Sequence, residues 1–201
     1  NMEIKEIWKN QAVVNTEQYD KLYKESIVDN ESFWEREGKR LKWTKEYSKI
    51  KDIKYNSDNL SIKWFYDGSL NVSENCIDRH AKKNPNKIAI IWEGDDPNNT
   101  QKITYKELLK NVCKTANALK KVGIKKGDKV TIYMTMIPEL AYTMLACARI
   151  GAIHSIIFGG FSSESIAGRI TDCKSNFVIT ADEGVRGGKI DRKSTRLNSS
   201  H

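Results

Sequence analysis

The sequence predicts an α/β protein. An N-terminal helical and loop extension, residues 1–75, precedes the start of a largely parallel, helix-covered sheet, residues 76–190. Three observations predict this class: from residue 86 onward short apolar runs alternate with longer amphipathic segments, the connections are short, and the apolar runs are nearly continuous. Alternation with short connections indicates crossover units and parallel strands, and continuous apolar strands indicate a sheet buried on both faces.

The alternation can be followed element by element. Strands are expected at residues 87–94, 128–134, 152–158 and 176–180, and helices at residues 103–123, 137–151 and 162–174. The first helix has the clearest signals, because Thr104 and Glu107 form a capping box and Gly123 supplies a stop. Its apolar face consists of Leu108, Val112, Ala116 and Leu119. Pro138 and Gly151 mark the start and the end of the second helix.

The N-terminal extension is less regular. Helical pieces are expected at residues 17–27 and 30–43, the second one capped by Asn30 or Ser32. Residues 51–75 are expected to form loops and a short strand. The aromatic residues of this region are expected to be packing anchors rather than a cofactor-binding motif: Phe33, Trp34, Trp64 and Phe65.

Composition disfavours several classes of protein. The 201 residues include 39% hydrophobic residues, enough for a core, and the 30% charged residues are spread along the chain. The net charge of +8 is interpreted as a solvated Lys-rich surface, because no basic run reaches five residues and no zinc-finger or helix-turn-helix spacing is present. Residues 1–30 contain no long uncharged apolar run, so no signal peptide or membrane span is expected. Widely spaced cysteines without a CxxC pair favour a reducing, cytoplasmic location: Cys76, Cys113, Cys147 and Cys173.

Two loops follow the carboxyl ends of predicted strands, where parallel sheets bind ligands. In the loop 158–163, Gly159 and Gly160 allow close approach of a ligand to the backbone, but a simple tight turn explains the pair equally well. In the loop 181–189, two cations flank two glycines, so that side chains and backbone amides can converge on one phosphate; a solvated surface loop is the alternative. These four residues are Arg186, Gly187, Gly188 and Lys189.

No catalytic residue is predicted. His80 and His154 lack a nucleophile or carboxylate that the spacing would place beside them. His80 is expected at a helix start and His154 in the core, while Asp128 is expected to be a turn residue.

Three segments together resemble the AMP-forming acetyl-CoA synthetases, a family within the adenylate-forming enzyme superfamily. They are the Phe-Trp pair at 33–34, the segment 69–80 and the long run 123–189. The resemblance is collinear over residues 16–190, and the run as a whole carries it rather than any single motif. One departure is Thr135, which stands where the family pattern has Pro and is expected to loosen the local turn.

The resemblance implies a two-step reaction in the complete enzyme. Acetate attacks the α-phosphate of ATP to give acetyl-adenylate and diphosphate, and the thiol of coenzyme A then displaces AMP, with Mg²⁺ accompanying ATP. The resemblance also implies that Arg186, Gly187, Gly188 and Lys189 contact the phosphate-bearing nucleotide end of coenzyme A. Gly159 and Gly160 are implied to lie near its path. The implied partners are acetate, ATP and coenzyme A, with no nucleic acid and no membrane.

The remaining adenylation machinery of the family has no counterpart in residues 1–190. The chain is therefore expected to be an inactive N-terminal fragment without catalytic residues, a metal site or a cofactor of its own. A propionate or other short-chain acyl-CoA synthetase, and a non-catalytic coenzyme A- or nucleotide-binding module, remain as alternatives. At residues 191–201 the resemblance stops, and codons similar to a common sequencing adapter encode this tail, so an artefact is expected, with a genuine disordered tail as the alternative.

Overall fold

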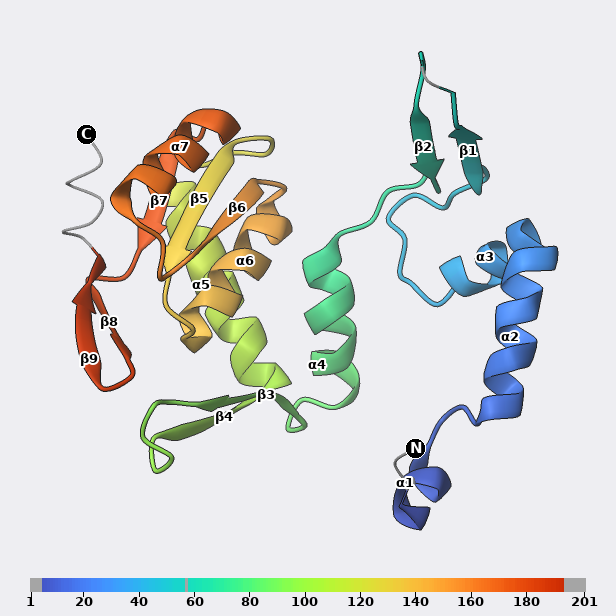
Figure 1. Ribbon diagram of the computed structural model, residues 1–201, viewed down its shortest axis with the longest axis horizontal. Helices are drawn as coiled ribbons and strands as arrows, with labels where there is room; N and C mark the ends of the chain where they lie inside the picture. The colour runs from blue at the N-terminus through green and yellow to red at the C-terminus, as the bar shows by residue number, and fades with distance from the viewer. Residues whose placement is uncertain (1–4, 57, 194–201) are drawn as a thin grey trace. The chain divides into compact units, whose positions relative to one another are not determined.

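The computed structural model describes residues 5–56 and 58–193, and the chain divides into two compact units, residues 1–70 and 71–201 (Figure 1). In the first unit, three helices precede an antiparallel hairpin: α1 (Glu6–Gln11), α2 (Thr16–Val28), α3 (Asn30–Gly38), β1 (Lys51–Lys54) and β2 (Ser61–Trp64). The cap expected for α3 is wrong, because the residue before the helix is Asp29 and the Asn30 side chain donates to the Ser26 carbonyl instead.

An aromatic cluster holds the first unit together. The rings of Trp43 and Tyr47 lie 4.8 Å apart, and the ring of Phe65 lies 4.7 Å from that of Tyr47. Such edge and tilted contacts stabilise a small core beyond the burial of area alone. The four residues predicted as packing anchors all make ring contacts, although the side chains of Trp34 and Trp64 remain exposed: Phe33, Trp34, Trp64 and Phe65.

The second unit contains the regular α/β region. Its elements are η1 (Glu74–Asp78, one π-helical turn), α4 (Arg79–Lys83), β3 (Ile88–Glu93), β4 (Thr100–Thr104), α5 (Tyr105–Lys121), β5 (Lys129–Met134), α6 (Pro138–Ile150), β6 (Ile153–Phe158), α7 (Ser163–Cys173), β7 (Phe177–Thr180), β8 (Glu183–Arg186) and β9 (Lys189–Arg192).

A three-stranded parallel sheet lies at the centre of this unit, with the strand order β6-β5-β7 (Figure 1). Side chains of β5 alternate between two buried layers: Val130, Ile132 and Met134 pack in the cluster that includes α5 and α6, whereas Tyr133 packs with Ile166 of α7. The expected parallel sheet with helices on both faces is therefore confirmed. Because β6 and β7 both pair with β5 in parallel, the carboxyl ends of all three strands lie at one edge.

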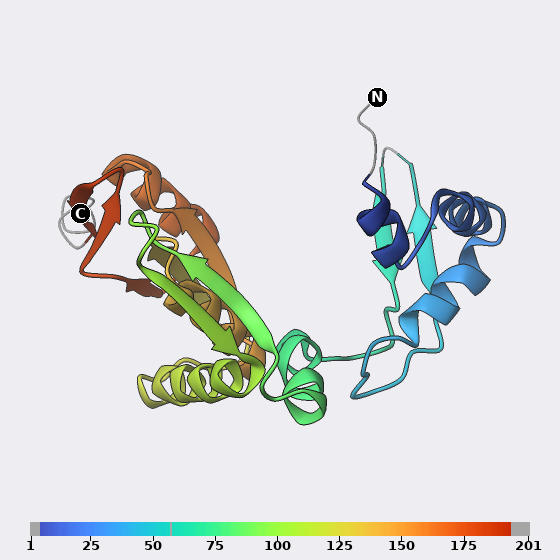
Figure 2. The same ribbon diagram turned by 90° about the horizontal axis from the view of Figure 1, so that it is seen from below.

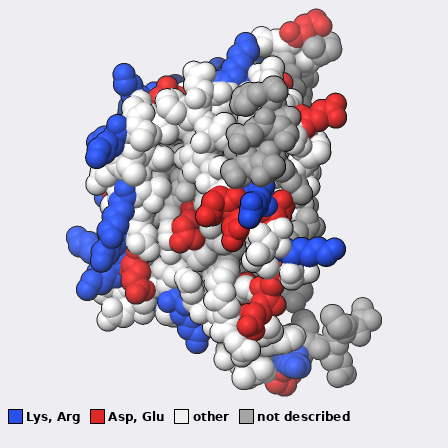
Figure 3. Space-filling model, turned by 90° about the vertical axis from the view of Figure 1, so that its left-hand side faces the viewer, with Lys and Arg blue, Asp and Glu red and all other residues white. Residues whose placement is uncertain are grey.

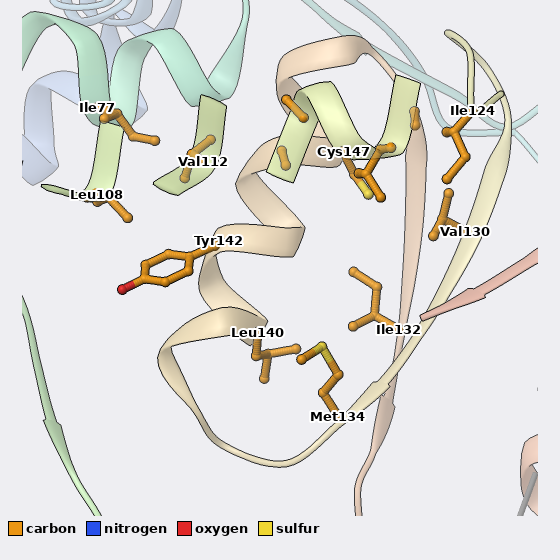
Figure 4. Packing of buried hydrophobic residues seen from close by; sticks show 14 of the residues in the cluster. Ile77, Leu108, Val112, Ile124, Val130, Ile132, Met134, Leu140, Tyr142 and Cys147 are labelled. Carbon is orange, nitrogen blue, oxygen red and sulfur yellow. The ribbon is translucent and has the colours of Figure 1, made fainter. Parts of the chain in front are cut away.

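The main core lies between β5 and the two long helices. Figure 4 shows side chains of β5 facing α6, with Met134 beside Leu140 and Ile132 between Met134 and Cys147. The predicted apolar face of α5 is buried, and the capping box is formed, since the amide of Thr104 donates to a Glu107 carboxylate oxygen over 2.8 Å. Full burial of an Ile side chain such as that of Ile132 contributes about 1.5–3 kcal/mol.

Two hairpins depart from the predicted pattern. β3 does not join the parallel sheet but pairs with β4 (Figure 2). β4 includes Ile103 and Thr104, the two residues expected to begin the following helix. The indole of Trp92 donates to the Met136 carbonyl over 2.6 Å, which fastens β3 to the loop after β5. The second hairpin consists of β8 and β9 and occupies the segment expected to be a loop.

Candidate functional site

The segment with two glycines between two cations is a tight hairpin turn. Arg186 at the end of β8 pairs with Lys189 at the start of β9, and Gly187 and Gly188 have φ angles of 58° and 72°. Positive φ at both central residues defines a type I′ turn, which matches the twist of antiparallel strands and requires residues such as Gly at both positions. We call these four residues the 186–189 turn.

The register of the hairpin brings the two cationic positions together. Directly paired positions on antiparallel strands project to the same face, about 4.5–5.5 Å apart at Cβ, and like charges at such positions destabilise the pair. Lys189 is exposed, and the side chain of Arg186 lies outside the described part of the chain. The backbone register therefore places two basic residues opposite each other across the turn, with the amides of Gly187 and Gly188 between them.

The hairpin packs against the carboxyl end of β5 through a glycine. A Cβ atom added to Gly184 would lie 2.0 Å from Cγ2 of Thr135, so only glycine permits this approach. Thr135 Oγ1 is buried and has no hydrogen-bond partner among the described residues. This hydroxyl occupies the position at which the resembled family has Pro, and it leaves a polar atom unsatisfied at the contact.

The other candidate glycines lie in the turn after β6. The amide of Phe161 donates to the Phe158 carbonyl over 3.0 Å, so Gly159 and Gly160 are the central residues of a β-turn. A Cβ atom at Gly159 would lie 3.1 Å from the Met134 carbonyl oxygen. The close approach to the neighbouring strand thus explains, without any ligand, why residue 159 is a glycine. This agrees with the tight-turn interpretation rather than with the ligand-binding one.

The two candidate loops are connected through the end of β9. Lys193 is 2% exposed; its ammonium donates to the Gly159 carbonyl, forms an ion pair of 2.6 Å with Asp191, and lies 5.3 Å from the centre of the Tyr133 ring. Lys193 belongs to the tail 191–201 expected to be an artefact, of which 194–201 lie outside the described residues. We therefore assign Lys193 no functional role, and the candidate site uses only the two hairpin pairs that lie before residue 191, Val185 with Ile190 and Arg186 with Lys189.

An acidic side chain that the sequence interpretation missed contacts the 186–189 turn. The backbone amide of Gly188 donates to Oδ2 of Asp95 over 3.2 Å. Asp95 lies in the loop 94–99 that joins β3 to β4, 93 residues earlier in the chain. No local pattern predicts a contact over such a separation.

The histidines do not join these loops. His80 lies in α4 with its ring stacked on that of Tyr105 at 5.0 Å, and His154 lies in β6. His154 is only half-buried, so the expected core position is wrong. Asp128 is the predicted turn residue, because its carboxylate accepts from the Lys125 amide over 2.7 Å.

A metal centre and a membrane-spanning helix are two further features that can be looked for in residues 5–56 and 58–193. Within these ranges no three or more His, Cys, Asp or Glu side chains are grouped so that they could hold a metal ion. No helix in the same ranges is both long and apolar enough to cross a membrane. On the face shown in Figure 3, one group of acidic side chains lies in the middle and many basic ones lie along the left margin, while further side chains of both signs are scattered over the rest, so this face is of mixed charge.

The chain belongs to the family of AMP-binding enzymes, because residues 77–200 match that family's model. Residues 19–76 match a second model, the acetyl-coenzyme A synthetase N-terminus. Similar relatives are the acetyl-coenzyme A synthetase of Parvibaculum lavamentivorans, 63% identical over 182 residues, and that of Bartonella quintana, 60% identical over 190 residues. These alignments cover 90% and 94% of this chain but only 28% and 29% of the relatives.

A solved structure shows the same fold. The acetoacetyl-CoA synthetase from Streptomyces lividans matches 90% of this chain and 28% of its own length, with a TM-score of 0.80 and 22% sequence identity. The resemblance and the fold class predicted from the sequence are thus confirmed. The chain spans a little over a quarter of the length of the relatives it matches.

Proposed function

We propose that this chain is the N-terminal part of an AMP-forming acetate–CoA ligase, in which the 186–189 turn binds the phosphate-bearing nucleotide end of coenzyme A. The complete enzyme converts acetate, ATP and coenzyme A to acetyl-CoA, AMP and diphosphate through acetyl-adenylate. The choice of acetate is supported by the relatives, which are named acetyl-coenzyme A synthetases. Residues 1–75 are the extension and 76–190 the start of the AMP-binding domain in this proposal.

The observation that carries the coenzyme site is the paired register of Arg186 and Lys189 across a two-residue turn. A phosphate that lies over the turn can accept from both cations, while Gly187 and Gly188 leave the backbone open to close approach. Arginine supplies a planar fork and lysine a mobile point charge, so the pair suits a phosphate group. Gly159 and Gly160, at the same edge of the sheet, are weaker candidates for contact with the same ligand.

The chain's own residues explain binding of the coenzyme but no step of bond making. The described residues include no set of ligands that fits Mg²⁺, so the ion that accompanies ATP is assigned to the rest of the enzyme. The fragment alone is accordingly expected to be inactive. A cytoplasmic location, with small molecules as partners and neither nucleic acid nor membrane, completes the proposal.

The test compares the two half-reactions in the complete enzyme. The double variant Arg186→Ala/Lys189→Ala is expected to raise the KM for coenzyme A by at least 10-fold, because each charge-assisted hydrogen bond contributes about 1.5–3 kcal/mol. Acetate-dependent exchange between ATP and diphosphate, which needs no coenzyme A, should stay at the wild-type rate.

A matched control removes the same charge from the opposite edge of the sheet. Lys125→Ala/Lys126→Ala alters the loop before β5 and should leave both half-reactions unchanged. Equal damage to both half-reactions by the variant at 186 and 189 would show that the turn is structural. Replacement of acetate by propionate in the exchange assay tests the alternative substrate.

A further inference from the structure

The 186–189 turn already holds an anionic group from its own chain. A carboxylate oxygen of Asp95 accepts from the amide of Gly188 over 3.2 Å. This amide lies between the two cationic positions of the turn, where a bound phosphate would find its backbone donor. The tip of the β3–β4 hairpin lies beside the turn of β8–β9 in Figure 1.

The loop that carries Asp95 is held by its own hydrogen bonds. The amide of Gly94 donates to the Asn99 carbonyl over 2.9 Å, and the amide of Asn98 donates to the Asp96 carboxylate over 2.9 Å. The Trp92 indole fastens the preceding strand to the body of the unit. Asp96 therefore stabilises the loop from within, whereas its neighbour Asp95 reaches across to the turn.

We propose that Asp95 is an internal competitor for the anion site of the 186–189 turn. This inference rests on the proposed function. In the chain without ligand, the Asp95 carboxylate occupies the Gly188 amide, which lies between the two basic positions of the turn. When coenzyme A binds, its 3′-phosphate displaces the carboxylate from this amide.

The experiment uses variants of the complete enzyme. Asp95→Ala removes the competing acceptor and its charge, and is expected to lower the KM for coenzyme A roughly 3- to 10-fold, the range of one ordinary hydrogen bond. Asp95→Asn keeps an acceptor but removes the charge, so a smaller decrease in the same direction is expected. With dephospho-coenzyme A, which lacks the 3′-phosphate, both variants should behave like wild type. The ATP–diphosphate exchange rate serves as the measure of intact folding.

Asp96→Asn is the matched control, because it removes one negative charge from the next residue while it keeps the acceptor within the loop. Its KM for coenzyme A should equal that of wild type. An increase in KM in Asp95→Ala would overturn the inference, since Asp95 would then hold the turn in its binding conformation. An equal decrease with dephospho-coenzyme A, or in Asp96→Asn, would overturn it as well.

The two proposals fail in different ways. If the variant at 186 and 189 impairs coenzyme A use but Asp95→Ala changes nothing, the proposed function stands and the inference about Asp95 is wrong. If neither variant changes the KM for coenzyme A, the proposed coenzyme site itself is wrong.

Discussion

Substitution of Gly184 tests whether the β8–β9 hairpin must lie against the end of β5. The added methyl group of Gly184→Ala would start 2.0 Å from Cγ2 of Thr135 and 3.0 Å from its Cβ, so the hairpin must move away. Overpacking of this kind costs about 1–3 kcal/mol. Because the hairpin carries the 186–189 turn, the KM for coenzyme A should rise together with the loss of stability, whereas ATP–diphosphate exchange should be retained.

The control for this variant is a glycine without neighbours. A Cβ atom at Gly168, in the exposed face of α7, meets nothing within 4 Å, so Gly168→Ala should stabilise the protein by about 0.5–1 kcal/mol through the helix propensity of Ala. The second control is Thr135→Ala, which removes the Cγ2 atom in question and the unsatisfied hydroxyl.

Urea denaturation of the complete enzyme measures the energetic coupling between residues 184 and 135. It is carried out on the wild type, on both single variants and on the double variant Gly184→Ala/Thr135→Ala. The clash predicts that Thr135→Ala recovers at least about 1 kcal/mol of the stability lost in Gly184→Ala. Additive effects would refute the packing explanation. If Gly184→Ala loses stability but keeps the wild-type KM for coenzyme A, the position of the hairpin does not affect coenzyme A binding.

Two further predictions concern titratable groups. A hydrogen bond from the Ser48 hydroxyl, with others from the Ser48 and Lys49 amides, lowers the pKa of Asp67 from 3.8 to about 2. Its stabilising contribution is therefore present above pH 3.8 and is lost as the pH falls toward 2. In acid denaturation, Asp67→Asn should lose less stability over this interval than wild type, and parallel curves would contradict the prediction. Burial raises the pKa of the Cys147 thiol from 9.0 to about 11, whereas Cys76 is exposed. Iodoacetamide at pH 8 should label Cys76 and spare Cys147, as read by peptide mass mapping, and equal labelling would show that the core opens easily.

The sequence predicts those parts of the fold that depend on local signals. Helix α5 is an example, since Thr104 and Glu107 cap it within one turn and its apolar face recurs at helical spacing. The β8–β9 hairpin also has a local signal, Gly-Gly between Val185 and Ile190, which pair across it. The sequence nevertheless predicts a loop there, because a strand of four residues is too short to show a convincing alternation.

Contacts between distant segments could not be predicted. The pairing of β3 with β4 is local but is also missed, because the strand pattern of residues 88–93 is equally suited to the parallel sheet and residues 103–104 are expected to begin the following helix. The contact of Asp95 with Gly188 and that of Thr135 with Gly184 both arise where loops at one edge of the sheet converge. A single sequence contains no periodicity that links such positions.

The two-residue length of the 186–189 turn restricts how the proposed coenzyme site can vary. Side chains along a strand alternate between faces with a period of two, so a single inserted glycine in the turn would shift the partner of Arg186 by one position. The lysine would then project from the opposite side, and one phosphate could no longer meet both cations. Attempts to change coenzyme preference should therefore exchange the residues at 186 and 189 and leave the spacing between them intact.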